Sequence, residues 1–190
     1  MKYYMEHYKS TSEEVIDEIR KAVLGVDPES VEELVQAILQ ADKVFFVAVG
    51  RVMLSLQAIA KRLAHLGIET HCVGEITEPA ITDKDLLIVG SGSGCSLFPV
   101  GIARKAKTFG AKIVHIGSNP QGDMKDIADF MVRIPVRTKL YLEDEIESKQ
   151  IMTSLFEQSL LILGDIVAKM IAEERQLVLH DLWQYHANLE

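Results

Sequence analysis

Hydrophobic residues recur at intervals of three and four in two blocks near the start of the chain. The first block consists of Val15, Ile16, Ile19, Ala22 and Val23, and the second of Val31, Leu34, Val35, Ile38 and Leu39. This spacing predicts two amphipathic helices. We expect Thr11 or Ser12 to cap the first helix, and Asp27 followed by Pro28 to begin the second.

From residue 44 onward, short continuous apolar runs alternate with helical blocks. The predicted strands are VFFVAVG, ETHCV, DLLIVG, KIVHIG and FMVRIP. The predicted helices between and after them are RVMLSLQAIAKRLAHLG, SLFPVGIARKAKTFG, the short DMKDIA and a long stretch from about 151 to 174. Apolar runs without alternation are typical of parallel strands buried on both faces. The order of elements therefore predicts an α/β fold, with a parallel sheet covered by helices on both sides.

The length of 190 residues predicts one domain spanning 1–190. Within it we expect an N-terminal helical segment of about 1–41, an α/β core of about 42–175 and a tail of 176–190. The tail contains Trp183, Tyr185 and His186, so we expect it to pack, on this chain or on a neighbouring subunit. The polar segment 137–150 is either a loop beside a site or an ordinary solvated connection.

Composition and charge exclude several classes of protein. Hydrophobic residues make up 48% of the chain and charged residues 25%, which predicts a globular protein. The net charge of −8 argues against a nucleic-acid partner. No apolar run approaches the length of a membrane span, and the start of the chain lacks the apolar core of a secretion signal, so we expect a cytoplasmic protein. Two widely separated cysteines predict free thiols without a metal site.

The loop GSGSG follows the third predicted strand and precedes a helix. The dinucleotide fingerprint requires a different glycine spacing after the first strand, and a P-loop requires Gly-Lys-Ser/Thr, so neither fits. Glycine N–H groups, the helix N-terminus and the hydroxyls of Ser91, Ser93 and Ser96 could together hold a terminal phosphate. The alternative is a tight turn whose serines only add solubility.

Two further side chains are candidates for acid–base chemistry. Glu157 lies in a helix that is apolar nearly all round, where a partly desolvated carboxylate accepts a proton more readily near neutrality. The alternative is a glutamate that complements the dipole of the first helical turn. His186 is a candidate acid or base, or a packing residue. Gly50 and Arg51 follow the first strand, at the sheet edge where ligands of parallel sheets bind.

The order of VGR, RLAHLG, VGEITEP, DLLIVGSGSG, KAKTFGAKIV, SLFEQ and HANLE resembles the sugar isomerase (SIS) domain, and the 6-phospho-3-hexuloisomerase family most closely. The resemblance covers about 31–190. It implies a three-layer α-β-α sandwich with a five-stranded parallel sheet, N-terminal helices and a long C-terminal helix. It also implies a homotetramer with shared active sites, no metal or other cofactor, and a sugar phosphate substrate.

The implied reaction interconverts 3-hexulose 6-phosphate and fructose 6-phosphate in the ribulose monophosphate pathway. Glu157 would move a proton between adjacent carbons through an enediolate, and His186 of another subunit would assist ring opening or oxygen protonation. The expected substrate- and phosphate-binding positions are Gly50, Arg51, Ser91, Gly92, Ser93 and Ser96.

Three positions depart from the family pattern. Val52-Met53 stand where the family has Ser-Gly, Cys95 stands where it has Glu, and Glu78 stands where it has Thr. All of them fall on loops expected to face substrate, whereas the core segments match the family pattern. This pattern leaves open an altered substrate, or a non-catalytic protein that binds a phosphosugar.

Overall fold

The structure is a computed structural model that describes residues 2–189. Its helices and strands follow one another as α1 (Lys2–Leu24), α2 (Pro28–Gln40), β1 (Val44–Val47), α3 (Gly50–Ala64), β2 (Thr70–Cys72), β3 (Leu86–Gly90), α4 (Leu97–Lys107), β4 (Lys112–Gly117), η1 (Asp123–Asp126), β5 (Phe130–Arg133), α5 (Ser154–Glu174) and η2 (Leu179–Tyr185). The segments η1 and η2 are 3₁₀ helices. The five predicted strands are therefore all present.

The strands form one parallel sheet in the order β2-β1-β3-β4-β5. Because all strands are parallel, their carboxyl ends meet at one edge, where the loops after β1, β3 and β4 lie together. The predicted α/β fold with a five-stranded parallel sheet is confirmed. The strand order reverses at β1 and β3, which places the loops after these two strands at the switch point.

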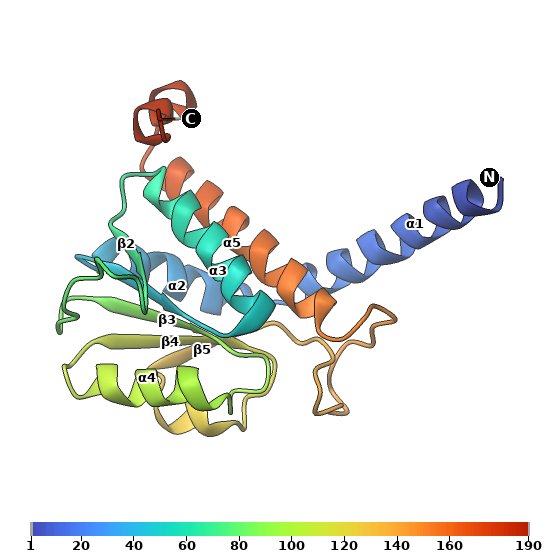
Figure 1. The fold of residues 1–190 in the computed structure, drawn as a ribbon, viewed down its shortest axis with the longest axis horizontal. Coiled ribbons are helices and arrows are strands. Elements are labelled where there is room, and N and C mark those ends of the chain that lie inside the picture. Colours follow the sequence, from blue (N-terminus) through green and yellow to red (C-terminus); the bar gives the residue numbers. More distant parts are fainter. Residues whose placement is uncertain (1, 190) are drawn as a thin grey trace.

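Alternate residues of each strand point into two separate cores. Phe46, Ile88 and Val114 pack against the face covered by α2, α3 and α5. Phe45, Leu87 and Ile113 pack against the face covered by α4 and η1. Figure 1 shows the resulting layers, with α4 on one side of the sheet and α2, α3 and α5 on the other. The continuous apolar runs of the sequence reflect this burial on both faces.

The first helix differs from its predicted start. α1 extends to the first described residues, so neither Thr11 nor Ser12 is a cap, and Ser12 Oγ instead donates to Tyr8 O within the helix. The extension was missed because residues 9–14 are all polar and interrupt the apolar spacing between Tyr8 and Val15. At the start of α2 the predicted cap is confirmed, since Ser30 N donates to the side chain of Asp27 at 2.9 Å.

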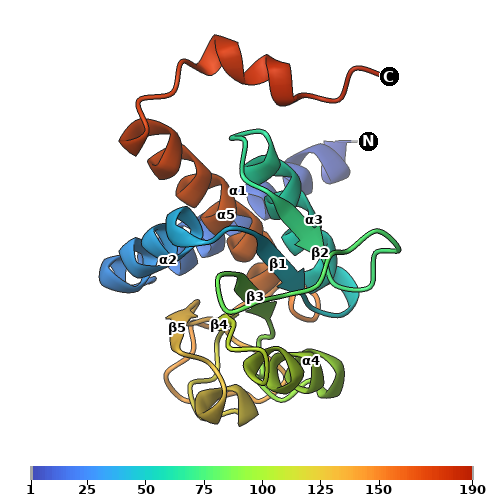
Figure 2. The same cartoon turned by 90° about the vertical axis from the view of Figure 1, so that its left-hand side faces the viewer.

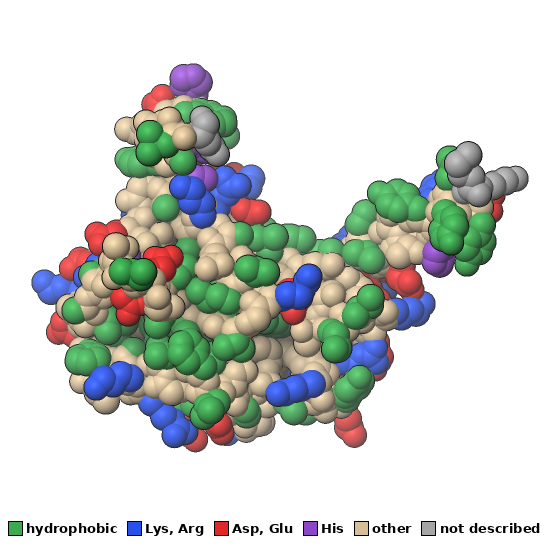
Figure 3. Space-filling model, in the orientation of Figure 1, with side chains coloured by type: hydrophobic (Ala, Val, Ile, Leu, Met, Phe, Trp, Pro, Cys, Tyr) green, Lys and Arg blue, Asp and Glu red, His purple; other side chains and the backbone are tan. Residues whose placement is uncertain are grey.

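Two segments project from the body of the protein. The N-terminal part of α1 extends away from the sheet, and the tail that carries η2 crosses the far end of α3 and α5 (Figures 1 and 2). Hydrophobic side chains gather on both projections in Figure 3. They include the exposed Tyr3, Tyr4, Met5 and Tyr8 on α1 and Trp183 on the tail. Among residues 2–189, no helix is long and apolar enough to cross a membrane.

The helices α3 and α5 lie side by side on the sheet, and Gly164 permits their close approach. A Cβ added to Gly164 would lie 2.2 Å from Ile59 Cγ1. Any side chain at position 164 would therefore push the two helices apart. This packing fixes the first turns of α3 and α5 relative to each other, and the candidate site is built from these two turns.

Candidate active site

The loop between β3 and α4 closes on itself through its own hydroxyls. Gly94 N donates to both the carbonyl O and the Oγ of Ser91, each at 3.1 Å. Ser91 Oγ donates in turn to Ser96 Oγ at 3.2 Å. Cys95 N lies 3.4 Å from Ser93 Oγ, which accepts its hydrogen. The three predicted serines are thus brought together, with Ser91 acting inside the loop.

Several donors of this loop remain available to a ligand. The hydroxyl protons of Ser93 and Ser96, and the N–H groups of Gly92, Ser93 and Ser96, have no acceptor among residues 2–189. Ser96 also precedes the first residue of α4, where N–H groups are unpaired and the helix dipole is positive. This arrangement of neutral donors is typical of a site for an anion.

Two side chains hold the glycine-serine loop, His115 from β4 and Asn119 from the turn after β4. His115 Nε2 lies 2.8 Å from Ser91 O, and because a carbonyl only accepts, the proton sits on Nε2. Burial lowers the pKa of His115 despite the opposing effect of this hydrogen bond, so the ring stays neutral. Asn119 Nδ2 donates to Ser93 O at 3.0 Å. Together these contacts hold the loop against the sheet.

Glu157 is buried in the first turn of α5 and pairs with Arg51 in the first turn of α3. Arg51 Nε donates to Glu157 Oε2 at 2.5 Å. The Glu157 side chain is 9% exposed, whereas that of Arg51 is 68% exposed. The pair therefore joins a carboxylate inside the protein to a cation at its surface, and leaves the other guanidinium nitrogens of Arg51 able to reach a ligand.

Two hydroxyl groups fix the other side of Glu157. Thr153 Oγ1 donates to Glu157 Oε1 at 2.9 Å, from the position just before α5. Ser55 Oγ donates to the main-chain O of Glu157 at 2.9 Å, from one turn after Arg51 on α3. Both carboxylate oxygens thus have a donor, and the carboxylate is held in one orientation.

The first turns of α3 and α5 lie next to the glycine-serine loop. A Cβ built on Gly92 would lie 3.8 Å from the ring of Phe156, the residue before Glu157. A Cβ built on Gly90 would lie 3.0 Å from Val52, the residue after Arg51. The predicted positions Gly50, Arg51, Ser91, Gly92, Ser93, Ser96 and Glu157 therefore gather at one edge of the sheet.

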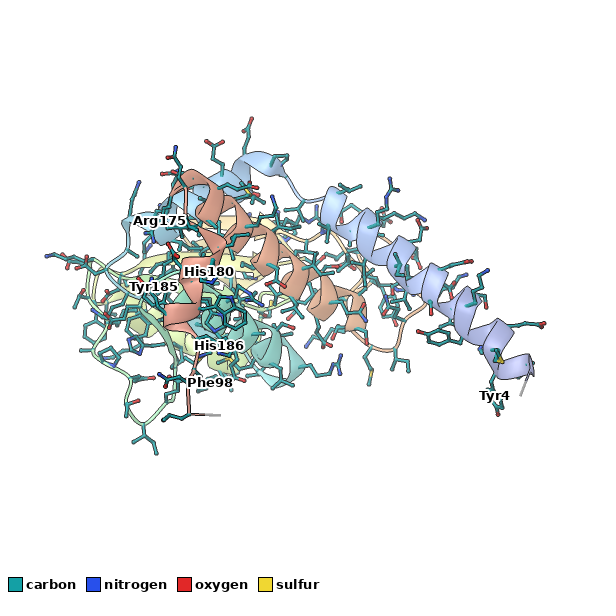
Figure 4. The ribbon with its side chains drawn as sticks, turned by 90° about the horizontal axis from the view of Figure 1, so that it is seen from above. Tyr4, Phe98, Arg175, His180, Tyr185 and His186 are labelled. Carbon is teal, nitrogen blue, oxygen red and sulfur yellow. The ribbon has the colours of Figure 1, made fainter. Side chains whose placement is uncertain are left out.

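His186 lies elsewhere within the single chain. Its ring stacks on His65 with centroids 5.3 Å apart, and lies 5.1 Å from Trp183. These residues line a cavity of about 220 Å³ at the far end of α3. Figure 4 shows His186 and Tyr185 on the tail that crosses this end. Ser55 and His65 are ten residues apart on the chain, which places His186 roughly 15 Å along the helix from the turn that contacts Glu157.

Two of the three departures from the family pattern lie outside the glycine-serine loop, and Val52-Met53 lie on α3 and not on the expected loop. Val52 and Met53 are partly buried and pack against the main core. The Glu78 carboxylate accepts a hydrogen bond from Gly74 N in its own turn. It also lines a separate groove between the 73–81 segment and α4. Only the exposed Cys95 lies in the loop itself.

Several residues of the site were not predicted. Thr153 precedes Glu157 by four residues, a spacing from which a contact could have been proposed. His115, Asn119, Thr138 and Glu145 reach the loop through tertiary contacts that carry no local pattern. Within residues 2–189, no group of three or more His, Cys, Asp or Glu side chains could hold a metal ion.

No protein-family model matches this chain, but individual proteins do. A protein of Mycobacterium gastri named 3-hexulose-6-phosphate isomerase is 39% identical over 176 residues, which cover 93% of this chain and 88% of that protein. A Bacillus subtilis protein of the same name is 33% identical, with 93% of this chain and 96% of that protein covered.

A solved structure from Methanococcus jannaschii, whose molecular function was inferred to be 3-hexulose-6-phosphate isomerase, has 30% identity and a TM-score of 0.81. The match covers 95% of this chain and 99% of that one. Identity of this extent over nearly the whole length, together with the shared fold, assigns a family: the chain belongs to the 3-hexulose-6-phosphate isomerases.

Proposed function

We propose that the protein is a phosphosugar isomerase that converts 3-hexulose 6-phosphate to fructose 6-phosphate. The names of its relatives support this reaction. The single observation that carries the chemistry is the buried Glu157 carboxylate, held by Arg51 and Thr153 beside an anion-binding loop. A phosphate on the loop and a base next to it are the two parts that such a reaction requires.

The reaction moves one proton between adjacent carbons. With the carbonyl at C3, Glu157 removes the hydrogen of C2, and the electron pair of that bond forms the C2–C3 double bond of an enediolate. The proton returns to C3, the hydroxyl proton moves from O2 to O3, and the carbonyl now lies at C2. A positioned base contributes roughly 10²–10⁴-fold to such a rate.

Arg51 and the loop have separate tasks in this proposal. Ser93, Ser96 and the free N–H groups hold the phosphate through several neutral hydrogen bonds, each contributing about 1 kcal/mol. Arg51 keeps Glu157 oriented and presents its remaining N–H groups to the oxygens of the enediolate, whose negative charge develops during the reaction.

The active site is proposed to be shared between subunits of a homo-oligomer, which we take to be a tetramer. The support is the position of His186, which lies at the opposite end of α3 from Glu157 in the same chain. The exposed aromatic residues on α1 and on the tail fit contacts with other copies. In the assembly, His186 of another subunit would protonate an oxygen or open the sugar ring.

The protein is further proposed to act in the cytoplasm, in the ribulose monophosphate pathway. The buried thiol of Cys72 and the exposed thiol of Cys95 are both free, which fits a reducing compartment. Burial raises the pKa of Cys72 to about 11, so this thiol stays protonated and unreactive.

The test is to incubate the protein with 3-hexulose 6-phosphate in D₂O and to follow the products by NMR. We expect fructose 6-phosphate with solvent deuterium at C3. The same experiment with other hexulose and pentulose phosphates identifies an altered substrate, because the true substrate is the one that takes up solvent deuterium. Tight binding of these sugars without any deuterium incorporation would contradict the proposal and indicate a non-catalytic sensor.

A further inference from the structure

We propose that Glu145 is a positioning residue that holds residues 91–96 in their anion-binding shape. This inference rests on the proposed function, because it assigns the support of the same phosphate loop. Glu145 lies in the segment 137–150, touches none of the loop donors, and would act through Ser118 and Thr138.

Glu145 is a buried carboxylate with donors on both of its oxygens. It is 8% exposed. Oε1 accepts from Thr138 Oγ1 at 3.1 Å and lies 3.0 Å from Ser118 Oγ, whose single proton is shared with Val136 O at 2.8 Å. Oε2 accepts from the N–H groups of Thr138 and Leu142, at 3.2 and 3.0 Å. A carboxylate with this many donors is expected to be fixed in place and to fix the segments that donate to it.

The two residues that Glu145 joins both reach Gly92, Ser118 through its main-chain N–H and Thr138 through its side chain. Ser118 N donates to Gly92 O at 3.0 Å, from the turn after β4. The methyl group of Thr138 lies on the other segment, and a Cβ built on Gly92 would be only 3.2 Å from it. Glu145 therefore contacts two residues that both touch Gly92, one through a hydrogen bond and the other through packing.

The contact at Gly92 sets the direction of a loop donor. Gly92 O accepts from the N–H groups of both Ser118 and Asn119, each at 3.0 Å. In a trans peptide the N–H points opposite to the C=O. The next N–H, that of Ser93, therefore points away from Ser118 and Asn119, and it has no acceptor among the described residues. A shift of Ser118 would rotate this peptide and move the donor.

The negative charge of Glu145 is stabilised by neutral donors that are directed at it. Arg133, the last residue of β5, also holds Ser118, because its Nε donates to Ser118 O at 2.8 Å while its Nη2 pairs with Asp144 at 2.7 Å. The segment 137–150 is thus part of the support of the site, even though it touches the anion loop only through the Thr138 methyl.

The test compares Glu145→Gln and Glu145→Ala with Glu147→Gln, a matched control. Glu147 lies in the same segment but is exposed and pairs with Arg137 at the surface. The affinity for inorganic phosphate is measured by ³¹P NMR, and KM and kcat with 3-hexulose 6-phosphate. We expect phosphate affinity to fall and KM to rise about tenfold in both Glu145 variants, with kcat within about twofold. The Glu147→Gln control stays at the wild-type values.

A pair of variants at Thr138 serves as an independent measurement and carries the test alone if the Glu145 variants do not fold. Thr138→Val removes the hydroxyl but keeps the methyl against Gly92, and Thr138→Ser does the reverse. We expect each to raise KM by a smaller factor than Glu145→Ala. A fall in kcat at unchanged KM, or phosphate affinity equal to that of the control, overturns the proposal. If the wild-type protein binds phosphate without turnover, the isomerase proposal fails, and the phosphate affinities still decide the role of Glu145.

Discussion

Arg51 and Glu157 form an ion pair between an exposed guanidinium and a buried carboxylate, 106 positions apart in the chain. The 2.5 Å contact joins the first turns of α3 and α5. Because the carboxylate is shielded from water, its contact with Arg51 and its hydroxyl donor Thr153 determine its orientation. We therefore expect the activity to depend strongly on the side-chain shape of both members of the pair.

Replacing Arg51 with lysine is expected to lower kcat/KM by roughly tenfold or more. Lysine keeps the positive charge but loses the planar fork that contacts Glu157 through Nε while other N–H groups face the ligand. Steady-state kinetics measure the effect, with Arg104→Lys on the exposed side of α4 as the control. Equal kinetics for both variants would show that charge alone is needed at position 51.

Gly164→Ala is expected to destabilise the protein by about 1–3 kcal/mol, although alanine favours helix. The added Cβ would lie 2.2 Å from Ile59 Cγ1 and force α3 from α5. Urea unfolding measures the change, and the double variant Gly164→Ala/Ile59→Ala should be destabilised by less than the sum of the two single variants. A stabilised Gly164→Ala protein would mean that the two helices are not in this contact.

Glu18 is expected to give a stability contribution that disappears in acid. Its carboxylate accepts from Lys149 N at 2.8 Å and Ser148 Oγ at 2.7 Å, and so fastens α1 to the segment before α5. Burial opposes the ionisation of this carboxyl, but the hydrogen bonds outweigh burial and lower the pKa. A lowered pKa in the folded state stabilises the fold above the unfolded pKa of about 4.3, and this stabilisation is lost as pH falls through the folded value.

The measurement is urea unfolding of the wild type and of Glu18→Gln across pH 3–7. We expect the wild type to be more stable by about 1–3 kcal/mol at neutral pH, with the difference shrinking below about pH 4. Asp17→Asn removes an exposed pair with Lys21 and is the control, for which little change is expected. A difference for Glu18→Gln that does not vary with pH would contradict this assignment.

Shared active sites predict that two inactive variants restore activity when mixed. Glu157→Gln and His186→Asn are each expected to be nearly inactive. If every site takes Glu157 from one subunit and His186 from another, random mixing leaves about one quarter of the sites intact. The mixed protein, refolded from equal amounts, should then show that fraction of wild-type activity. No recovery would mean that both groups act within one chain, and an active His186→Asn variant would mean that His186 has no role.

The sequence predicted the centre of the sheet because β1, β3 and β4 are buried on both faces and read as nearly continuous apolar runs. The anion loop could be located for the same reason, since GSGSG follows directly on the apolar run of β3. Arg51 was found from its place after β1, and Glu157 from its apolar helix. These features depend on residues close together in the chain.

The rest depends on contacts between distant segments. Glu145 lies in a polar stretch without periodicity, and only the fold brings it to Ser118 and Thr138. The pairing of Arg51 with Glu157 depends on the packing of α3 on α5. The early start of α1 was missed because the polar residues 9–14 interrupt its apolar spacing. The division of the chain into segments of 1–41, 42–175 and 176–190 remains a prediction.

The most direct measurement of the central claim is solvent exchange in the Glu157→Gln variant. The amide keeps the shape of the side chain but cannot accept a proton from carbon. We expect this variant to bind inorganic phosphate with wild-type affinity and to unfold at the wild-type temperature, while deuterium incorporation from D₂O into the sugar phosphate falls by roughly 10²–10⁴-fold. Incorporation at the wild-type rate would show that another group moves the proton.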